Sequence, residues 1–177
     1  MRLFIAIGPD DPVKDLLCRA QRQLKRQALG GRFSRRESLH LTLAFLGEAP
    51  DIRRAAIALD QIQAAPFSLA VQGLGYFPSA EGQTWWMGTA PCPPLAALHR
   101  QLCRQLRAQG FSLEDRPFRP HLTLGRGIRL PAGFDSQALA RQLGGAVQRV
   151  ACIRLMESTR RQGLLCYEER YRRPLCP

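Results

Sequence analysis

The sequence predicts an α+β fold with two pseudo-symmetric lobes, each an antiparallel sheet with flanking helices, around a central cleft. Strand and helix signals alternate along the chain, and no low-complexity segment or linker interrupts them. The tetrapeptide HLTL occurs at 40–43 and again at 121–124, which is 121 − 40 = 81 residues later. One such strand in each half suggests two related lobes rather than a doubly wound sheet. The length of 177 residues suits one bilobal domain, 1–177.

The first half contains three strand signals and two helix signals. The opening run RLFIAIG is rich in Ile, Leu and Phe, which is typical of a buried strand. Asp11 and Pro12 then supply an N-cap and a first-turn proline, and Gly30-Gly31 follows the helix that they start. We expect strands at 2–8, 38–47 and 67–77, and helices at 11–29 and 50–66.

The second half repeats this alternation. A loop with Pro78 and Gly82 separates the last strand of the first half from the next strand. An amphipathic helix follows, and Gly110 ends it. We expect strands at 83–90, 121–126, 147–157 and 164–171, a helix at 93–110 and a short helix around 135–143.

The charge of the chain favours an anionic partner. Its formal net charge is +12, and all but two of its 26 basic residues are arginine. A guanidinium binds phosphate oxygens in a bidentate manner, so nucleic acid is the first partner to consider. A base-composition bias of the genome explains much of the preference for arginine over lysine, but it does not explain the excess positive charge.

The sequence also indicates a compartment. No run approaches the roughly 18 apolar residues of a membrane span, so we expect no membrane association. The N-terminal segment has the pattern of a strand rather than of a secretory signal, which favours a cytoplasmic protein. None of the six cysteines forms a C-x-x-C pair, so we expect free, mostly buried thiols and no zinc site.

The repeated tetrapeptide contains the candidate catalytic residues. In a strand, residues i and i+2 face the same way, so His40 and Thr42 share one face and the leucines share the other. His121 and Thr123 repeat this arrangement. Two such pairs across one cleft suit phosphodiester chemistry without a metal, because one imidazole can accept a proton while the other donates one. Threonine hydroxyls can hold the phosphate oxygens. A lone strand histidine is more often structural, and the duplication favours catalysis.

These motifs resemble those of the 2H phosphoesterase superfamily, and more closely the RNA 2′,3′-cyclic phosphodiesterases of the 2′-5′ RNA ligase family. The segments LHLTLAFLGE, PFSLAVQGLGYFPS, WWMGT and DRPFRPHLTLGR have the look and order of that family along nearly the whole chain. Ala44 stands where relatives often carry a basic residue, and the C-terminal segment follows the family pattern only loosely.

The resemblance implies a bilobal fold with a V-shaped cleft. It implies hydrolysis of RNA 2′,3′-cyclic phosphate ends to 2′-phosphomonoesters without a metal or a cofactor. By the family pattern, His40 would be the proton donor to the leaving 3′ oxygen and His121 the acceptor from water. Thr42 and Thr123 would hold the phosphate. We expect a monomer whose partner is RNA with a 2′,3′-cyclic phosphate end.

Arg126 is a further candidate for binding the phosphate. Strict alternation places it on the face opposite His121, but the glycines on either side of it are typical of a bulge that would turn it toward the substrate. With no bulge it would be a solvent or inter-strand arginine. We also expect Arg32, Arg35 and Arg36 in a loop, and Arg116 and Arg119, either to line the cleft mouth or to be solvated.

Other aromatic and histidine residues have alternative interpretations. Tyr76, Phe77, Trp85 and Trp86 could form a platform that stacks a base, although Trp86 and one of Tyr76 and Phe77 are expected in the core. His99 lies with leucines on one helix face, and we expect it to pack there rather than to act as a third catalytic histidine.

Three other functions remain open from the sequence. The same two histidines could join a 5′-hydroxyl to a cyclic end, giving a 2′-5′ linkage. The chain could be a non-catalytic RNA- or nucleotide-binding module, although such a module has no need for two proton carriers. It could also hydrolyse small cyclic nucleotides.

Overall fold

The computed structural model describes residues 2–48 and 51–176. Its helices are α1 (Asp11–Gln27), α2 (Ile52–Asp60), α3 (Pro93–Ala108) and α4 (Ser136–Leu143), with a 3-10 turn η1 at Arg36–Ser38. Its strands are β1 (Arg2–Ile7), β2 (Gly30–Phe33), β3 (Leu41–Glu48), β4 (Phe67–Ser79), β5 (Gly82–Thr89), β6 (His121–Arg129), β7 (Gly145–Val150), β8 (Cys152–Arg161) and β9 (Leu164–Pro174). The predicted α+β class is confirmed.

The described strands form one sheet in the order β7-β4-β5-β6-β3-β1-β8-β9, with β2 paired to β6, and all the pairings are antiparallel. The sheet has two halves, because β3 and β6 meet at one residue pair only, Leu41 opposite Leu122. We call β3-β1-β8-β9 the His40 lobe, and β7-β4-β5-β6 with β2 the His121 lobe. The two sheets expected from the sequence are therefore two halves of one sheet, which are joined at the strands of the repeated motif.

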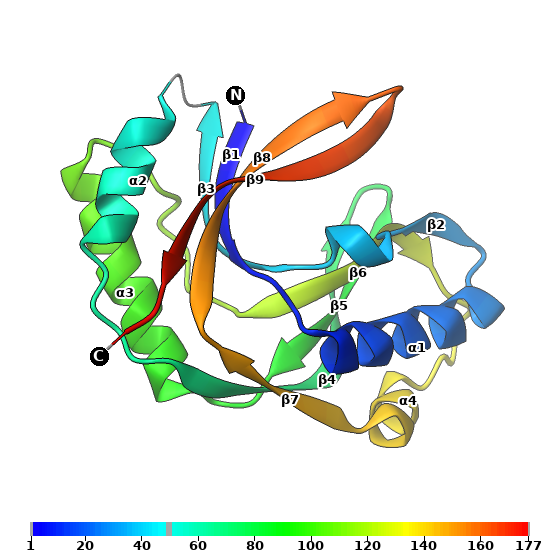
Figure 1. Ribbon diagram of the computed structural model, residues 1–177. Coiled ribbons are helices and arrows are strands. Elements are labelled where there is room, and N and C mark those ends of the chain that lie inside the picture. The colour runs from blue at the N-terminus through cyan, green and yellow to red at the C-terminus, as the bar shows by residue number, and fades with distance from the viewer. Residues whose placement is uncertain (1, 49–50, 177) are drawn as a thin grey trace.

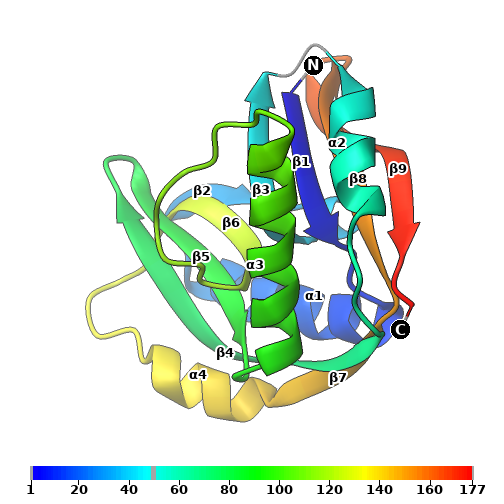
Figure 2. The ribbon, with the colours of Figure 1, turned by 90° about the vertical axis from the view of Figure 1, so that its left-hand side faces the viewer.

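Helices α1 and α3 each lie beside the lobe that does not contain the strand before them (Figure 1). Helix α1 follows β1 of the His40 lobe, yet it contacts β6 and β7 of the His121 lobe. Helices α2 and α3 contact each other and lie beside β3 and β1 in Figures 1 and 2, although α3 follows β5 of the other lobe and also contacts β4. The buried apolar stripe of α1, which includes Leu16, Leu17 and Leu24, belongs to one core that extends through both lobes. The two halves of the chain are thus interleaved in space.

A buried amide ties α1 to the strand that carries the second motif. Gln21 is nearly inaccessible to solvent, and its Nε2 donates to the carbonyl of Leu124 at 2.8 Å and to that of Ser34 at 2.7 Å. A buried amide must find such partners, because an unpaired one costs on the order of 1–3 kcal/mol. These bonds fix the position of β6 relative to α1.

Several boundaries differ from the sequence-based expectation. The strand expected at 38–47 begins at Leu41, just after His40, and the single strand expected at 147–157 is two strands, β7 and β8, which lie in different lobes. Asp10, not Asp11, caps α1, and its side chain accepts a hydrogen bond from the amide of Val13 at 3.0 Å. Helix α2 ends at Asp60, six residues before the predicted end, and the predicted start at residue 50 lies outside the described residues. The segment 30–33 was expected to be a loop, but it is β2, because the edge of β6 supplies its hydrogen-bonding partner.

The C-terminal segment forms a regular hairpin of β8 and β9 despite its loose likeness to the family pattern. In Figure 1 this hairpin projects beyond the body of the molecule. Among the described residues, no helix is long and apolar enough to cross a membrane.

Candidate active site

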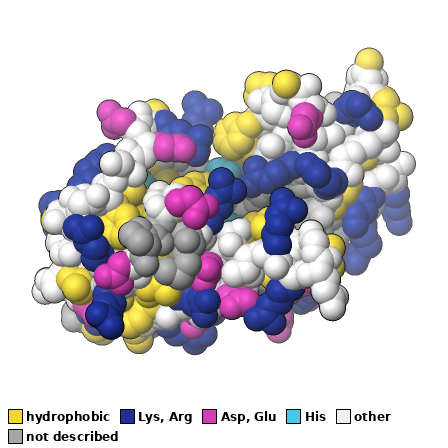
Figure 3. Space-filling model, turned by 90° about the horizontal axis from the view of Figure 1, so that it is seen from above, with side chains coloured by type: hydrophobic (Ala, Val, Ile, Leu, Met, Phe, Trp, Pro, Cys, Tyr) yellow, Lys and Arg dark blue, Asp and Glu magenta, His cyan; other side chains and the backbone are white. Residues whose placement is uncertain are grey.

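The two H-x-T strands open into one cleft. Its volume is about 700 Å³, and its lining includes His40, Thr42, His121, Thr123 and Arg126. One wall is formed by α3 and by the loop 109–120, which runs down beside that helix in Figure 2. Seen from above in Figure 3, a histidine surface is visible in a hollow, with basic side chains next to it. The structure therefore brings together all five residues that the sequence singled out.

Both histidines are held in the same way. Nδ1 of His40 lies 2.7 Å from the carbonyl oxygen of Ser38, and Nδ1 of His121 lies 2.6 Å from that of Arg119. A carbonyl can only accept, so Nδ1 carries the proton in each ring. This leaves Nε2 of each imidazole as the atom that gains or loses a proton. Each ring is thus oriented by the residue two positions before it.

The surroundings favour the neutral form of both rings. Burial lowers the pKa of His40, and the positive charges of Arg126 and of His121 lower this pKa further. Burial likewise lowers the pKa of His121, with the charges of Arg126 and Arg116 adding to it. In each case the carbonyl bond at Nδ1 opposes the shift. An anion bound between the rings would favour the protonated form and reverse part of this effect.

A bulge decides the position of Arg126. Relative to β5, β6 contains one extra residue between Thr123 and Gly125. Leu124 and Gly125 are consequently both buried, and Arg126 is exposed and lines the cleft on the same side as Thr123. Of the two alternatives left open by the sequence, the structure shows the bulged one.

The first motif has a matching bulge with a different residue after it. Strand β3 contains one extra residue between Thr42 and Ala44 relative to β1. Leu43 and Ala44 are both buried, and Phe45 then lines the cleft with 49% of its surface exposed. Phe45 thus occupies in β3 the position that Arg126 occupies in β6, five residues after the histidine.

Aromatic rings surround each histidine. The ring of His40 has its centroid 4.8 Å from that of Phe4 and 5.0 Å from that of Tyr167. The ring of His121 lies 5.1 Å from Phe77 and 5.9 Å from Trp86. These contacts limit the motion of both imidazoles.

Two expectations about the aromatic residues need correction. Trp86 was expected in the core, but it lies on the His121 side of β5, and Trp85 is the buried one, with 2% exposure. One of Tyr76 and Phe77 was also expected in the core, but Tyr76 is exposed and Phe77 is partly exposed beside His121. Alternation shows that neighbours point to opposite faces, but it cannot show which face is the core. Tyr167 was not recognised from the sequence as a residue of the site, because its contact with His40 depends on the pairing of β9 with β8.

The arginines that were expected at the cleft mouth divide into two groups. Arg116 and Arg119 line the cleft, which is one of the two alternatives that the sequence left open. Arg32, Arg35 and Arg36 do not line it: Arg36 binds Asp11 and Asp15 of α1, Arg35 donates to the carbonyl of Leu165, and Arg32 lies 4.0 Å from Glu81. Partners outside the cleft hold Arg35 and Arg36, and Arg32 is exposed to solvent.

Two lining arginines were not predicted. Arg100 and Arg107 of α3 face the cleft. In the sequence they resemble the solvated charges of any amphipathic helix. The spacing of seven residues does place them on one helix face, but only the tertiary structure shows that this face borders the cleft.

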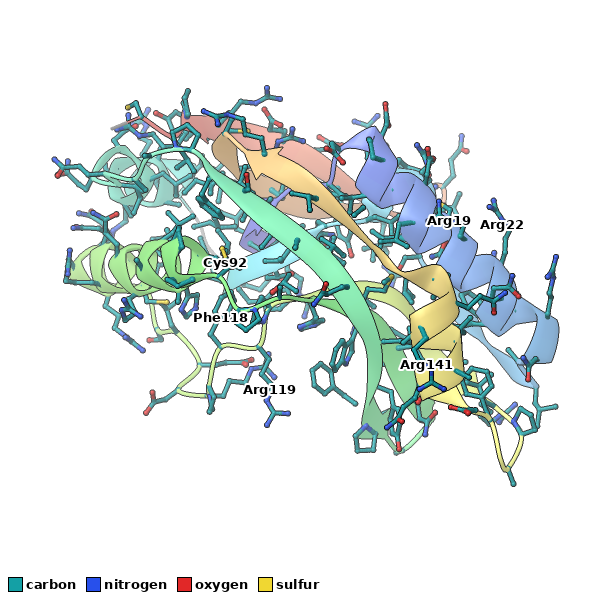
Figure 4. The ribbon with its side chains drawn as sticks, turned by 90° about the horizontal axis from the view of Figure 1, so that it is seen from below. Arg19, Arg22, Cys92, Phe118, Arg119 and Arg141 are labelled. Atoms are coloured by element: carbon teal, nitrogen blue, oxygen red, sulfur yellow. The ribbon has the colours of Figure 1, made fainter. Side chains whose placement is uncertain are left out.

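His99 packs as expected. Its ring stacks on Phe118 at 3.8 Å with an interplanar angle of 5°, and its Nε2 lies 3.4 Å from Sγ of Cys103. Figure 4 shows Phe118 beside α3. This contact holds the loop 109–120 against the helix.

Cysteines and acidic residues do not form an evident metal site in the described part of the chain. No group of three or more His, Cys, Asp or Glu side chains there could hold a metal ion. All six cysteines are free, as expected, but none is fully buried: Cys176 is exposed and the other five are partly exposed.

This fold, with two H-x-T strands facing one cleft, defines a protein of the 2H phosphoesterase class. A family model described as the 2′-5′ RNA ligase superfamily matches residues 9–156, and the chain belongs to this family. The chain is 34% identical over 131 residues to a Thermotoga maritima protein named RNA 2′,3′-cyclic phosphodiesterase, which covers 71% of this chain and 70% of the relative. It is 31% identical over 155 residues to a Methanothermobacter thermautotrophicus protein of the same name, covering 85% and 82%.

Solved structures show the same fold. The apo crystal structure of Escherichia coli LigT matches 99% of this chain and 98% of its own, with a TM-score of 0.80 at 24% identity. A Thermus thermophilus protein matches the same shares with a TM-score of 0.78 at 25% identity.

Proposed function

We propose that the chain hydrolyses RNA 2′,3′-cyclic phosphate ends to 2′-phosphomonoesters. The observation that carries this proposal is the equivalent anchoring of two imidazoles, each with Nδ1 bound to a carbonyl and Nε2 left to exchange a proton at one cleft. The relatives named RNA 2′,3′-cyclic phosphodiesterase support the reaction and its substrate. We further propose that residues 1–177 act as one bilobal unit and as a monomer.

In the proposed mechanism the two histidines start in opposite protonation states. Neutral His121 accepts a proton from water at Nε2 while the water oxygen bonds to phosphorus. The bond from phosphorus to the 3′ oxygen breaks, and His40 gives its Nε2 proton to that oxygen. The product carries a 2′-phosphate and a free 3′-hydroxyl, and proton exchange with solvent restores both rings. The assignment of donor and acceptor follows the family pattern.

The remaining three residues bind the phosphate. Thr42 and Thr123 donate hydroxyl hydrogen bonds to the non-bridging oxygens, and Arg126 supplies the positive charge. Burial, together with the charge of Arg126, lowers the pKa of His121 and so favours its neutral form before the substrate arrives. In this proposal no step is assigned to a metal or to a nucleotide cofactor.

A product assay tests the proposal directly. A short RNA with a 2′,3′-cyclic phosphate end is incubated with the protein in excess EDTA, and the position of the phosphate in the product is determined. We expect a 2′-phosphate, and we expect His40→Ala and His121→Ala each to lower kcat by about 10²–10⁴-fold. If the wild type binds this RNA without converting it, the protein is a binding module rather than an enzyme. Conversion of mononucleotide cyclic phosphates alone would favour the small-nucleotide alternative.

Ligation is a second candidate, favoured by the description of the family as 2′-5′ RNA ligases. The reverse reaction would use His121 as the acid and His40 as the base. Incubating the cyclic-ended RNA with a 5′-hydroxyl RNA and resolving 2′-5′ linked product tests it. Because water is in large excess, we expect hydrolysis to dominate.

A further inference from the structure

The α3 wall of the cleft carries charge that the proposed chemistry does not use. Arg100 and Arg107 line the cleft from this helix, and Arg119 lines it from the adjoining loop. No hydrogen bond or ion pair engages any of these three guanidinium groups within the described chain. Their neighbour Arg116, by contrast, pairs with Glu114 at 2.6 Å. These three guanidinium groups therefore border the same cavity as the catalytic strands.

The geometry of the helix makes Arg100 and Arg107 a continuous feature. They are seven residues apart, so they lie on one face and are separated by roughly 10 Å along the axis. His99 and Cys103 line the cleft between and beside them. The acidic groups on the cleft wall are Glu114, which is paired, and Asp115. The wall therefore keeps an excess of positive charge.

The loop that faces this helix is fixed in place. Phe118 stacks on His99, which holds the loop 109–120 against α3. Figure 4 shows Arg119 extending from the loop away from the body of the protein, next to Phe118. A strand that leaves the catalytic residues between the loop and α3 would pass Arg119 and the helix arginines.

We propose that Arg100 and Arg107 form a second phosphate site, which binds the internucleotide phosphate immediately upstream of the cyclic end. This inference rests on the proposed function, because it takes the terminal phosphate to lie between His40 and His121. The terminal cyclic phosphate carries a single negative charge and already has Arg126. The pair on α3 suits a further phosphate, and guanidinium groups bind phosphate oxygens with charge-assisted hydrogen bonds. The preferred substrate is then an oligonucleotide of at least two residues rather than a cyclic mononucleotide.

The test removes the charge of one phosphate by replacing one of its non-bridging oxygens with a methyl group. Two dinucleotides with a 2′,3′-cyclic end are compared: one has a natural phosphodiester linkage, and the other has an uncharged methylphosphonate in its place. For the wild type we expect kcat/KM to be about tenfold higher for the charged linkage, with the difference in KM. In the double variant R100A/R107A we expect the ratio of the two kcat/KM values to fall to about 1.

A matched control removes the same charge elsewhere. Arg19 and Arg22 are exposed on the outer side of α1 and project away from the sheet in Figure 4. The double variant R19A/R22A has the same net charge as R100A/R107A, and it should keep the wild-type ratio. A loss of the ratio in both variants would mean general electrostatic attraction rather than a site.

The outcomes separate this inference from the proposed function. If the wild type hydrolyses both dinucleotides with equal kcat/KM, the cyclic phosphodiesterase stands and the second phosphate site is rejected. If R100A/R107A keeps the tenfold ratio, the upstream phosphate binds elsewhere, and the arginines of α3 are excluded as its binding site. If the wild type hydrolyses neither dinucleotide, the proposed function itself fails.

Discussion

The two H-x-T strands have the same backbone and different surroundings. Each has a histidine bound through Nδ1 to the carbonyl two residues earlier, and each has a bulge directly after the threonine. Five residues after the histidine, however, β3 carries Phe45 and β6 carries Arg126. His40 contacts Phe4 and Tyr167, and His121 contacts Phe77 and Trp86. Burial and the charge of Arg126 lower the pKa of both rings, and Arg116 lowers that of His121 further. The duplicated backbone holds equivalent atoms, and the side chains around it make the two sites unequal.

The largest expected effect distinguishes the proposed proton donor, His40, from the proposed acceptor, His121. Replacing the 3′ oxygen of the cyclic substrate by sulfur gives a leaving group that needs little protonation, because thiols have a pKa near 8.5. With this substrate we expect His40→Ala to regain at least about 100-fold of its lost kcat, while His121→Ala regains nothing. Single-turnover rates of both variants on both substrates provide the measurement. Equal recovery of the two variants would contradict the assigned roles.

Arg126→Gln removes the charge that only one of the two strands carries. We expect kcat/KM to fall by about 100-fold through loss of phosphate stabilisation. Because Arg126 lowers the pKa of both histidines, both limbs of the kcat/KM profile should also move to higher pH. The base is then neutral only at higher pH, and the acid stays protonated to higher pH. The control is Arg129→Gln on the same strand, since Arg129 does not line the cleft. An unchanged pH profile in Arg126→Gln would count against this account.

Replacing each threonine by valine tests whether the two hydroxyls are equivalent. Valine keeps the shape and removes the donor, so we expect Thr42→Val and Thr123→Val each to lower kcat/KM by about tenfold. Thermal unfolding of the variants should match the wild type, because both side chains face the cleft. A loss confined to one variant would show that one lobe alone binds the phosphate.

Tyr167→Ala acts on one histidine only. It exposes His40 to water, and since burial lowers the pKa of His40, that pKa should rise. We expect the alkaline limb of the kcat/KM profile to move to higher pH while the acid limb, set by His121, stays. Because the ring of His40 loses its contact with Tyr167, its orientation is less well fixed, and we expect kcat to fall a few-fold while KM stays unchanged. A shift of both limbs would show that the substitution disturbs the whole cleft.

Gly125→Ala has the smallest expected effect on chemistry and a measurable effect on stability. A Cβ at Gly125 would lie 2.7 Å from the carbonyl oxygen of Arg32, because β2 pairs closely with β6 there. The equivalent residue of the other strand is already alanine, Ala44. We expect the free energy of unfolding to fall by about 1–3 kcal/mol and Tm by several degrees. An unchanged Tm would indicate that β2 moves away at little cost.

Much of this site followed from the sequence because it depends on local periodicity. Alternation in the two motifs placed each histidine with its threonine, and recurrence of the motif predicted two lobes. The features that were missed depend on contacts between distant segments. The glycines of β2 are poor strand formers, and the edge of β6 alone makes them a strand. The face of Trp86, the approach of Tyr167 and the cleft-facing side of α3 likewise depend on which segments become neighbours.

The interleaving of the two halves has a consequence for how the protein is made. Helix α1 completes the lobe of His121, and the lobe of His40 combines β1 and β3 with β8 and β9 and has α3 beside β3 in Figures 1 and 2. On a ribosome, the N-terminal half emerges with β1 and β3 but without β8 and β9, which follow much later in the chain. Contacts of such long sequence separation are slow to form. The lobe of His40 therefore lacks two of its four strands until the end of synthesis, although all the residues that line the cleft lie between 40 and 126.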